Sequence, residues 1–310
     1  MVTAPEPVSD DDDNGEARTF EGGQREGMKA NSLENRTVLV TGAASGFGRS
    51  MALGLLAAGA RVALTDVSAQ HLKAVNAEVR SFGNRTAVFA ADLANADQVN
   101  QLIHTLVPFG TVDVLINNAG IAPGAGSRDY VTNPVRFWHH DEAATRRYFE
   151  INSIAPYLLA RALVGGMIER RWGRIVNVTT SLGSMMRGGM AGYGGSKAGL
   201  ESHTAIMAAD LEGTGVTANV LIPGGASNTP MIPAESGFDR AALIQPEAMV
   251  APILWLASVE SDGVTACRFI AAKWDPALPN ETAARESGAP VAWSELGAQT
   301  IFPKDNVQKS

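Results

Sequence analysis

The chain alternates between short apolar runs of strand length and longer segments with helical periodicity, and this alternation restricts its fold more than any other feature. The short runs are apolar throughout, which is typical of strands buried on both faces, as in a parallel sheet. Helices between such strands cover the two faces. We therefore predict an α/β fold of the Rossmann type, a doubly wound, seven-stranded parallel sheet with helices on both faces. The expected strands are 36–41, 61–66, 86–92, 112–117, 174–180, 216–222 and 265–271.

One domain accounts for most of the 310 residues, because single α/β domains routinely reach about 250 residues. We place this Rossmann-type dehydrogenase domain at 35–272, between an N-terminal tail (1–34) and a C-terminal extension (273–310). Residues 1–36 hold nine acidic and four basic side chains, which leaves a net charge of −5 out of the total of −7. With almost no apolar periodicity, the tail is predicted to be disordered.

The remaining charge excludes several classes of partner. The body of the chain is close to neutral and lacks the basic face that nucleic-acid binding requires. The first 30 residues show no basic segment followed by an apolar one, and no apolar run approaches the ~20 residues of a membrane span. Cys267 is the only cysteine, so no internal disulfide forms, which fits a reducing compartment. We expect a cytoplasmic protein without nucleic-acid or membrane partners.

A glycine-rich turn, "TGAASGFG" at 41–48, follows the first expected strand and leads into a helix. Gly42 permits the tight turn, Gly46 lets the backbone approach a pyrophosphate, and Gly48 allows close packing of helix and strand. Free N–H groups at the start of the helix attract the anion. This position in the chain predicts a dinucleotide site, with Ser45 and Phe47 also in contact with the cofactor.

Asp66 ends the second expected strand, ~20 residues after the glycines, where a carboxylate accepts hydrogen bonds from the adenosine ribose. A carboxylate there repels the 2′-phosphate of NADP, so the cofactor is predicted to be NAD. Arg49 would partly offset that repulsion, and NADP is kept as the less favoured alternative.

Seven pieces of the chain, in order, resemble the short-chain dehydrogenase/reductase family between about residues 35 and 272. The resemblance implies that Asp92 and Leu93 hold the adenine, and that the "NNAG" turn, with Asn118, Ala119 and Gly120, supports the sheet centre and touches the ribose. It also implies that Pro223, Gly224 and Thr229 line the nicotinamide end. The pieces are "TGAASGFG" (41–48), Asp66, "ADL" (91–93), "NNAG" (117–120), Asn152, "YGGSK" (193–197) and "IPGGASNTPM" (222–231).

Tyr193 and Lys197 are spaced to share one face of a helix. Hydride transfer at a carbinol carbon requires a general acid/base beside the oxygen. A phenol has a pKa near 10, and a cation about 6 Å away lowers it by roughly two units at an effective dielectric near 20. We therefore expect Tyr193 to be the acid/base and Lys197 to lower its pKa and bind the ribose.

Family members usually place a serine thirteen residues before the tyrosine as the donor to the substrate oxygen, and here that register holds Thr180. Ser181, one residue later, is the competing candidate, since both hydroxyls have the same capacity. Asn152 matches the family's asparagine and would hold a water that contacts Lys197. A polar residue that only kinks the helix before Pro156 is the alternative.

These features predict an NAD-dependent oxidoreductase that interconverts a secondary alcohol and a ketone. An NADPH-dependent 3-oxoacyl-type reductase and a non-catalytic dinucleotide sensor are the alternatives. We expect no metal site, because the adjacent residues of "HHDE" (139–142) do not share a face. The resemblance also implies a homotetramer or homodimer formed through helices expected at 141–172 and 192–213.

Overall fold

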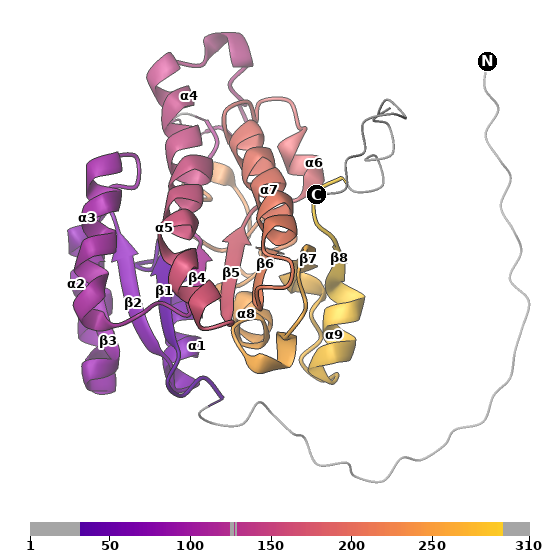
Figure 1. Ribbon diagram of the computed structural model, residues 1–310. Coiled ribbons are helices and arrows are strands. Elements are labelled where there is room, and N and C mark those ends of the chain that lie inside the picture. Colours follow the sequence, from indigo (N-terminus) through magenta and orange to yellow (C-terminus); the bar gives the residue numbers. More distant parts are fainter. Residues whose placement is uncertain (1–31, 125–126, 128, 294–310) are drawn as a thin grey trace, which may run out of the picture.

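The computed structural model describes residues 32–124, 127 and 129–293. Nearly all of the predicted acidic tail (1–34) and the end of the C-terminal extension, from residue 294, lie outside these ranges. The strands form one sheet in the order β3-β2-β1-β4-β5-β6-β7-β8 (Figure 1). They are β1 (Thr37–Thr41), β2 (Arg61–Asp66), β3 (Thr86–Ala90), β4 (Val114–Asn117), β5 (Gly173–Val178), β6 (Val216–Ile222), β7 (Cys267–Ile270) and β8 (Gly288–Pro290).

The first seven strands are parallel, as predicted, and the Rossmann-type fold is confirmed. The predicted count of seven is one too low, because β8 pairs antiparallel with β7. This strand has only three residues, two of them Gly288 and Pro290, and so carries no apolar run that marks a strand. Residues of the C-terminal extension thus join the same sheet.

The helices cover both faces of the sheet, and Figure 1 shows α5 and α7 in front of it. Residues of α1, α2, α8 and α9 pack in one core cluster, and those of α3, α5 and α7 pack in the other. Successive residues of β1 divide accordingly: Val38 and Val40 belong to the first cluster, and Leu39 to the second. The helices are α1 (Gly46–Ala57), α2 (Ala69–Glu78), α3 (Ala96–Leu106), α4 (Glu142–Phe149), α5 (Ala155–Glu169), α6 (Leu182–Met185), α7 (Tyr193–Asp210), α8 (Val250–Leu256) and α9 (Asn280–Ser287).

The helix expected at 141–172 is interrupted. A π-helical turn, η4 (Glu150–Ile154), separates α4 from α5 and carries Asn152. By length and composition the whole stretch, Glu142–Glu169, could cross a membrane, but 44% of its most apolar window is buried inside the fold. Core helices of soluble proteins pass the same test, so this stretch is weak evidence for a membrane span.

The chain reverses its direction of travel across the sheet between β1 and β4, which lie side by side. In such sheets, ligands bind in the crevice outside the carboxyl ends of the strands at this switch point. The turns after β1, β2, β4, β5 and β6 all open toward that end, where α4 and α6 also lie (Figure 1).

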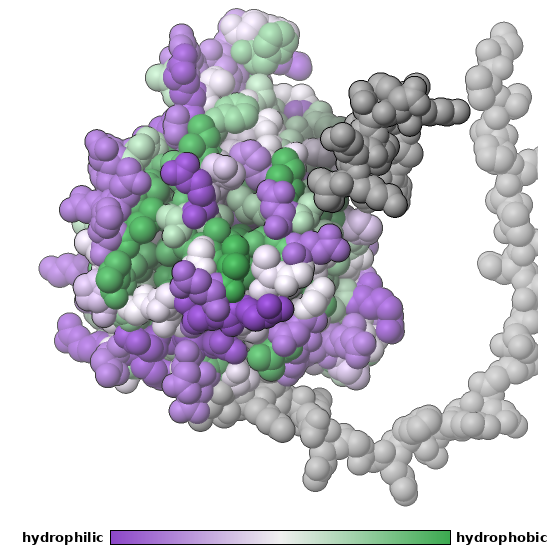
Figure 2. All heavy atoms as spheres, in the orientation of Figure 1, coloured by the Kyte–Doolittle hydropathy of each residue, from purple (hydrophilic) through white to green (hydrophobic). Residues whose placement is uncertain are grey.

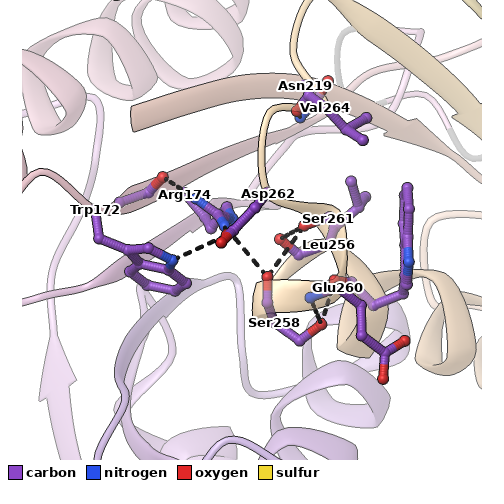
Figure 3. Close-up of polar contacts among 11 residues, drawn as sticks. Trp172, Arg174, Asn219, Leu256, Ser258, Glu260, Ser261, Asp262 and Val264 are labelled. Atoms are coloured by element: carbon purple, nitrogen blue, oxygen red, sulfur yellow. Dashed lines mark hydrogen bonds and ion pairs between the residues drawn. The ribbon is translucent and has the colours of Figure 1, made fainter. Parts of the chain in front are cut away.

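A buried arginine closes the opposite end of β5. Arg174, 1% exposed, pairs with Asp262 and donates to the carbonyl oxygens of Gly173 and Ser258 (Figure 3). The Trp172 indole also donates to Asp262 and lies between two guanidinium groups, those of Arg174 and Arg36, whose Cζ atoms are 4.2 Å and 3.6 Å from its ring centroid. These contacts anchor the start of β5 to the loop before β7.

Candidate active site

The glycine turn after β1 has the geometry that a phosphate cradle requires. Gly42 adopts a φ of +63°, which favours glycine. A Cβ on Gly48 would lie 2.0 Å from the carbonyl oxygen of Gly42, so only glycine fits there. The Ser45 side chain does not cap α1, and no acidic residue lies in the first turn, so the first-turn amides remain open to an anion. These residues fit a dinucleotide.

The turn after β4 is tied to the end of β1. The Thr41 hydroxyl accepts from the backbone N–H groups of Asn118 and Ala119, both at 3.0 Å, and the Asn118 amide donates to the carbonyl oxygen of Thr41 at 2.9 Å. A Cβ on Gly42 would meet the Ala119 Cα at 2.8 Å. The two ligand-facing turns therefore pack directly on each other.

Asp66 lies at the carboxyl end of β2, as predicted. One carboxylate oxygen accepts from the backbone N–H of Ala44 in the glycine turn at 3.2 Å, and the other from Ser68 at 3.0 Å. Arg49, the residue expected to offset its charge, forms a two-point ion pair with Glu78 of α2 instead. The carboxylate thus faces the crevice while this arginine is engaged elsewhere.

Asp92 caps the loop after β3 by accepting from the N–H of Ala94 at 2.9 Å, and Leu93 beside it is buried. Arg147 of α4 pairs with Asp92 at 3.2 Å. This ion pair joins the loop after β3 to α4. No local pattern in the sequence marks Arg147, because its partner lies 55 residues away in the chain.

A cavity of about 620 Å³ lies at the carboxyl ends of the strands. All the residues predicted for the site line it except Gly48, which packs under the turn, and Asn152. The predicted residues in its wall are Gly42, Ser45, Gly46, Phe47, Asp66, Asp92, Leu93, Asn118, Ala119, Gly120, Thr180, Ser181, Tyr193, Lys197, Pro223, Gly224 and Thr229.

Tyr193 begins α7 and is 9% exposed. Burial is the largest influence on its phenol, a hydrogen bond with Thr180 opposes it, and Tyr130 and Tyr148 add to it, so that together these groups raise the pKa to about 12. The prediction that Lys197 lowers the pKa of Tyr193 below 10 is therefore wrong for the protein without bound cofactor, because the protein's own groups raise that pKa. Residue spacing reveals the nearby cation but not the cost of burying the phenolate.

Lys197 lies one turn after Tyr193 and is 3% exposed. Its Nζ donates to the carbonyl oxygen of Val178, at the end of β5, at 2.8 Å. Burial lowers its pKa to about 8. The amine is therefore close to its titration point near neutral pH.

The two hydroxyl candidates differ in their partners. The Thr180 side chain hydrogen-bonds the phenol of Tyr193. Ser181 caps α6, where its Oγ accepts from the Ser184 N–H at 3.2 Å and shares a hydrogen bond with the Ser184 hydroxyl at 2.8 Å. The geometry favours Thr180 as the donor, as the register did.

Asn152 is fully buried in the π-helical turn, an element found frequently at functional sites. Its Oδ1 accepts from the Ile121 N–H at 3.1 Å, and its Nδ2 donates to the Ser196 hydroxyl at 3.0 Å. A Cβ on Gly120 would lie 3.1 Å from Asn152 Oδ1 and 3.3 Å from Lys197 Nζ, so the two side chains flank that glycine. The water relay stays a prediction.

The segment after β6 forms a further part of the cavity wall. Thr229 lies over the glycine turn, where a Cβ on Gly46 would meet it at 3.1 Å. Tyr130 belongs to the long loop after β4. Its phenol O–H donates to the carbonyl oxygen of Met231 at 3.0 Å, which joins this loop to the segment after β6. The family resemblance implies that Thr229 lines the nicotinamide end, but no sequence motif marks Tyr130. Other wall residues here are Val131, Arg187, Met190, Ile232 and Phe238.

Comparison with known proteins agrees with this geometry. The sequence profile of the short chain dehydrogenase family matches residues 36–237. The chain belongs to this family. Short-chain dehydrogenases are oxidoreductases that act on CH–OH groups with NAD(P), and the enzyme class predicted from the sequence is confirmed.

Two related reductases illustrate the likeness in sequence. The chain is 37% identical over 195 residues to the 3-oxoacyl-[acyl-carrier-protein] reductase of Synechocystis, an alignment that covers 62% of this chain and 75% of that protein. It is 32% identical over 243 residues to the 3-oxoacyl-[acyl-carrier-protein] reductase FabG of Thermotoga maritima, with 75% and 94% covered.

A solved structure shows the same fold. It is that of an NAD(P)-dependent gluconate 5-dehydrogenase, so described, from Beutenbergia cavernae with bound NADP. It is 31% identical, has a TM-score of 0.66, and the match covers 76% of this chain and 95% of that one.

Proposed function

We propose that this short-chain dehydrogenase uses NAD to interconvert a secondary alcohol and a ketone. One observation carries the choice of cofactor: Asp66 lines the cavity at the end of β2 while Arg49 is paired with Glu78. A carboxylate in that place binds ribose hydroxyls and repels a 2′-phosphate. The cofactor supplies or accepts the hydride, and the side chains of the chain itself handle the proton.

Tyr193 is the proposed acid/base. With a pKa of about 12 it is protonated at neutral pH, which suits proton donation to a ketone oxygen. Thr180 has one hydroxyl hydrogen, which bonds the phenol in the free enzyme and would turn to the substrate oxygen when substrate binds, while the hydroxyl oxygen can accept from the phenol. Lys197, protonated below about pH 8, places positive charge beside the phenolate that forms when the proton leaves. Asn152 orients the Gly120 turn beside Lys197.

The substrate end of the cavity favours an apolar substrate with one anionic group. Met190, Ile232 and Phe238 supply apolar wall, and flexible thioethers suit an adaptable pocket. Arg187 lines the same cavity and is exposed. A carboxylate or phosphate on the substrate would bind this guanidinium.

An NADPH-dependent 3-oxoacyl-type reductase is the second candidate. The observation in its favour is that the relatives from Synechocystis and T. maritima are named 3-oxoacyl-[acyl-carrier-protein] reductases, and the B. cavernae structure binds NADP. Asp66 argues against it for this chain, since like charges brought together cost several kcal/mol.

The deciding experiment measures kcat/KM for NADH and NADPH with a panel of ketones, and for NAD and NADP with the matching alcohols, by absorbance at 340 nm. A ratio of about tenfold or more in favour of NAD(H) is expected. A ratio that favours NADP(H) contradicts the assignment, and 3-oxoacyl thioesters in the panel then test the second candidate.

We also propose a cytoplasmic homodimer or homotetramer. Figure 2 shows apolar surface gathered over α5 and α7. Tyr157 and Ile168 of α5 and Ile206 of α7 are large apolar residues exposed there, at 42%, 39% and 55%. Exposed apolar patches of this kind mark association surfaces. Light scattering across a concentration series measures the oligomeric state.

A further inference from the structure

The face of α7 that carries Tyr193 and Lys197 continues into the core with Glu201. The three residues are spaced four apart and therefore lie in one row along the helix. Glu201 is 0% exposed, a rare environment for a carboxylate unless it is paired. It does not line the cavity, so binding of substrate or cofactor does not explain it.

Both oxygens of Glu201 are bound. Oε2 accepts from the Thr179 hydroxyl at 2.7 Å, and Oε1 accepts from Arg268 Nε at 2.9 Å and from the backbone N–H of Ala292 at 3.3 Å. Arg268, on β7 and 7% exposed, also donates from Nη2 to the carbonyl oxygen of Thr180 at 3.1 Å. The ion pair thus reaches the residue that hydrogen-bonds Tyr193.

Three consecutive residues around the carboxyl end of β5, Val178, Thr179 and Thr180, are each hydrogen-bonded by a buried charged side chain. Lys197 binds the carbonyl oxygen of Val178, Glu201 binds the hydroxyl of Thr179, and Arg268 binds the carbonyl oxygen of Thr180. Val178 is the last residue of β5 and still pairs with β6, whereas Thr179 and Thr180 lie beyond the strand pairing of the sheet. For these two residues, side chains replace the sheet as support.

Stability alone does not account for the pair, because apolar residues often replace a buried ion pair without loss of stability. What apolar residues cannot supply is the directional hold on Thr179 and Thr180. We propose that Glu201 and Arg268 are positioning residues that hold Thr180 in line with the Tyr193 phenol and the substrate oxygen. This inference rests on the proposed roles of Thr180 and Tyr193.

The main test is the double variant Glu201→Leu/Arg268→Leu, which removes both charges together and leaves no buried ion unpaired. We expect a thermal midpoint close to wild type and a fall in kcat of about 10- to 100-fold, because displacement of a catalytic group by about 1 Å costs up to that much. KM for NAD should change little, since neither residue lines the cavity.

Arg174→Leu is the matched control. It removes a second buried guanidinium that binds main-chain carbonyl oxygens, at the other end of the same strand. We expect a lower thermal midpoint with unchanged kcat. An equal fall in kcat in this variant would show that the loss follows from weakened folding and would overturn the proposal.

Glu201→Gln separates geometry from charge. Its carbonyl oxygen still accepts from Arg268, and its amide donates to the Thr179 hydroxyl. It should therefore retain most of the activity that the double variant loses. If Glu201→Gln loses as much kcat as the double variant while it folds normally, charge rather than position is responsible, and the proposal fails.

The variant Thr180→Ala separates a failure of the proposed Thr180 role from a failure of the positioning role of Glu201 and Arg268. In a Thr180→Ala background the leucine pair should lower kcat no further, because the residue that it positions is gone. If Thr180→Ala alone leaves kcat unchanged, the proposed role of Thr180 fails. If Thr180→Ala lowers kcat but the leucine pair does not, only the positioning role of Glu201 and Arg268 fails.

The pH profile gives a readout that a purely structural role would not move. Loss of the Thr180 hydrogen bond removes a contact that favours the phenolate, while Tyr130 and Tyr148 continue to oppose it. In ketone reduction the alkaline limb that belongs to Tyr193 should therefore shift to higher pH in the double variant and stay in place in Arg174→Leu, while the earlier limb near pH 8 that belongs to Lys197 should move in neither. An unshifted Tyr193 limb together with wild-type kcat would refute the inference.

Discussion

Arg49 Nε donates to Glu78 Oε2 at 2.8 Å. The arginine next to the glycine turn is therefore bound to α2 and does not serve as a phosphate ligand while this pair is formed. The pair is exposed, with 41% and 36% of the two side chains accessible. Such pairs are weak and break when a better partner is offered. Cofactor preference should therefore respond to Glu78 as well as to Asp66.

Glu78→Gln should raise kcat/KM for NADP by a few-fold, because a freed Arg49 can approach the 2′-phosphate. Asp66→Asn should raise it by about tenfold or more, because it removes the repulsive charge itself, and it should weaken use of NAD. Steady-state kinetics with both cofactors measure the change. Asp97→Asn, a charge change on α3 outside the cavity wall, is the control and should leave the ratio unchanged.

Thr180→Ala should lower kcat by about 100-fold, since removal of one preorganised donor costs about that much. Ser181→Ala should lower the free energy of unfolding by about 1 kcal/mol through loss of the α6 cap, with a small effect on kcat. Thr180→Ser keeps the hydroxyl and should retain activity. A larger fall in kcat for Ser181→Ala than for Thr180→Ala would reverse the assignment.

Lys197 should make stability depend on pH in a specific window. Its pKa is lowered to about 8 from 10.5, so between these values the unfolded chain binds a proton that the folded protein does not. Stability from this group therefore rises as pH increases through the window. Relative to Lys197→Met, wild type should gain about 3 kcal/mol between pH 8 and 10.5.

Urea unfolding of both proteins across that range measures the difference. The Tyr193 phenol titrates near pH 10 in the unfolded chain of both proteins, and its contribution to stability is common to both and cancels in the difference. A difference in stability that does not change with pH would mean that Lys197 stays charged in the fold.

Trp172→Leu should destabilise the protein by about 2–4 kcal/mol, because Arg36 and Arg174 both lose the ring that they stack on and Asp262 loses a donor. Trp172 lies just before the start of β5 and Thr180 just after its end, so kcat at 25 °C should be unchanged. Chemical unfolding and activity assays on the same preparation check both parts. A parallel loss of kcat would mean that the two ends of β5 are coupled.

The glycine turn, Asp66 and the Tyr193/Lys197 pair could be placed from the sequence because each depends on local spacing along the chain. Contacts between distant segments could not be predicted in the same way. Arg147 meets Asp92 across 55 residues, and Arg268 meets Glu201 across 67, with no local pattern to mark either pair. The prediction of the Tyr193 pKa was wrong for the same reason, because this pKa depends on burial, which the whole fold determines.

The π-helical turn was missed because a π-helix differs from an α-helix in its hydrogen-bond register, and nothing in the residues Glu150–Ile154 marks that change. β8 was missed because three residues of Gly-Ala-Pro carry no strand signal. In both cases tertiary packing outweighs local propensity.

β8 also determines how the sheet can grow. An open edge strand exposes amide and carbonyl groups that recruit strands from other molecules. β7 would be such an edge, but β8 covers it, and β8 is three residues long and ends in Pro290, which has no N–H to donate. Within the described part of the chain, this edge is therefore a poor template for pairing with strands of other molecules. We expect β8 to protect the protein from aggregation through this edge.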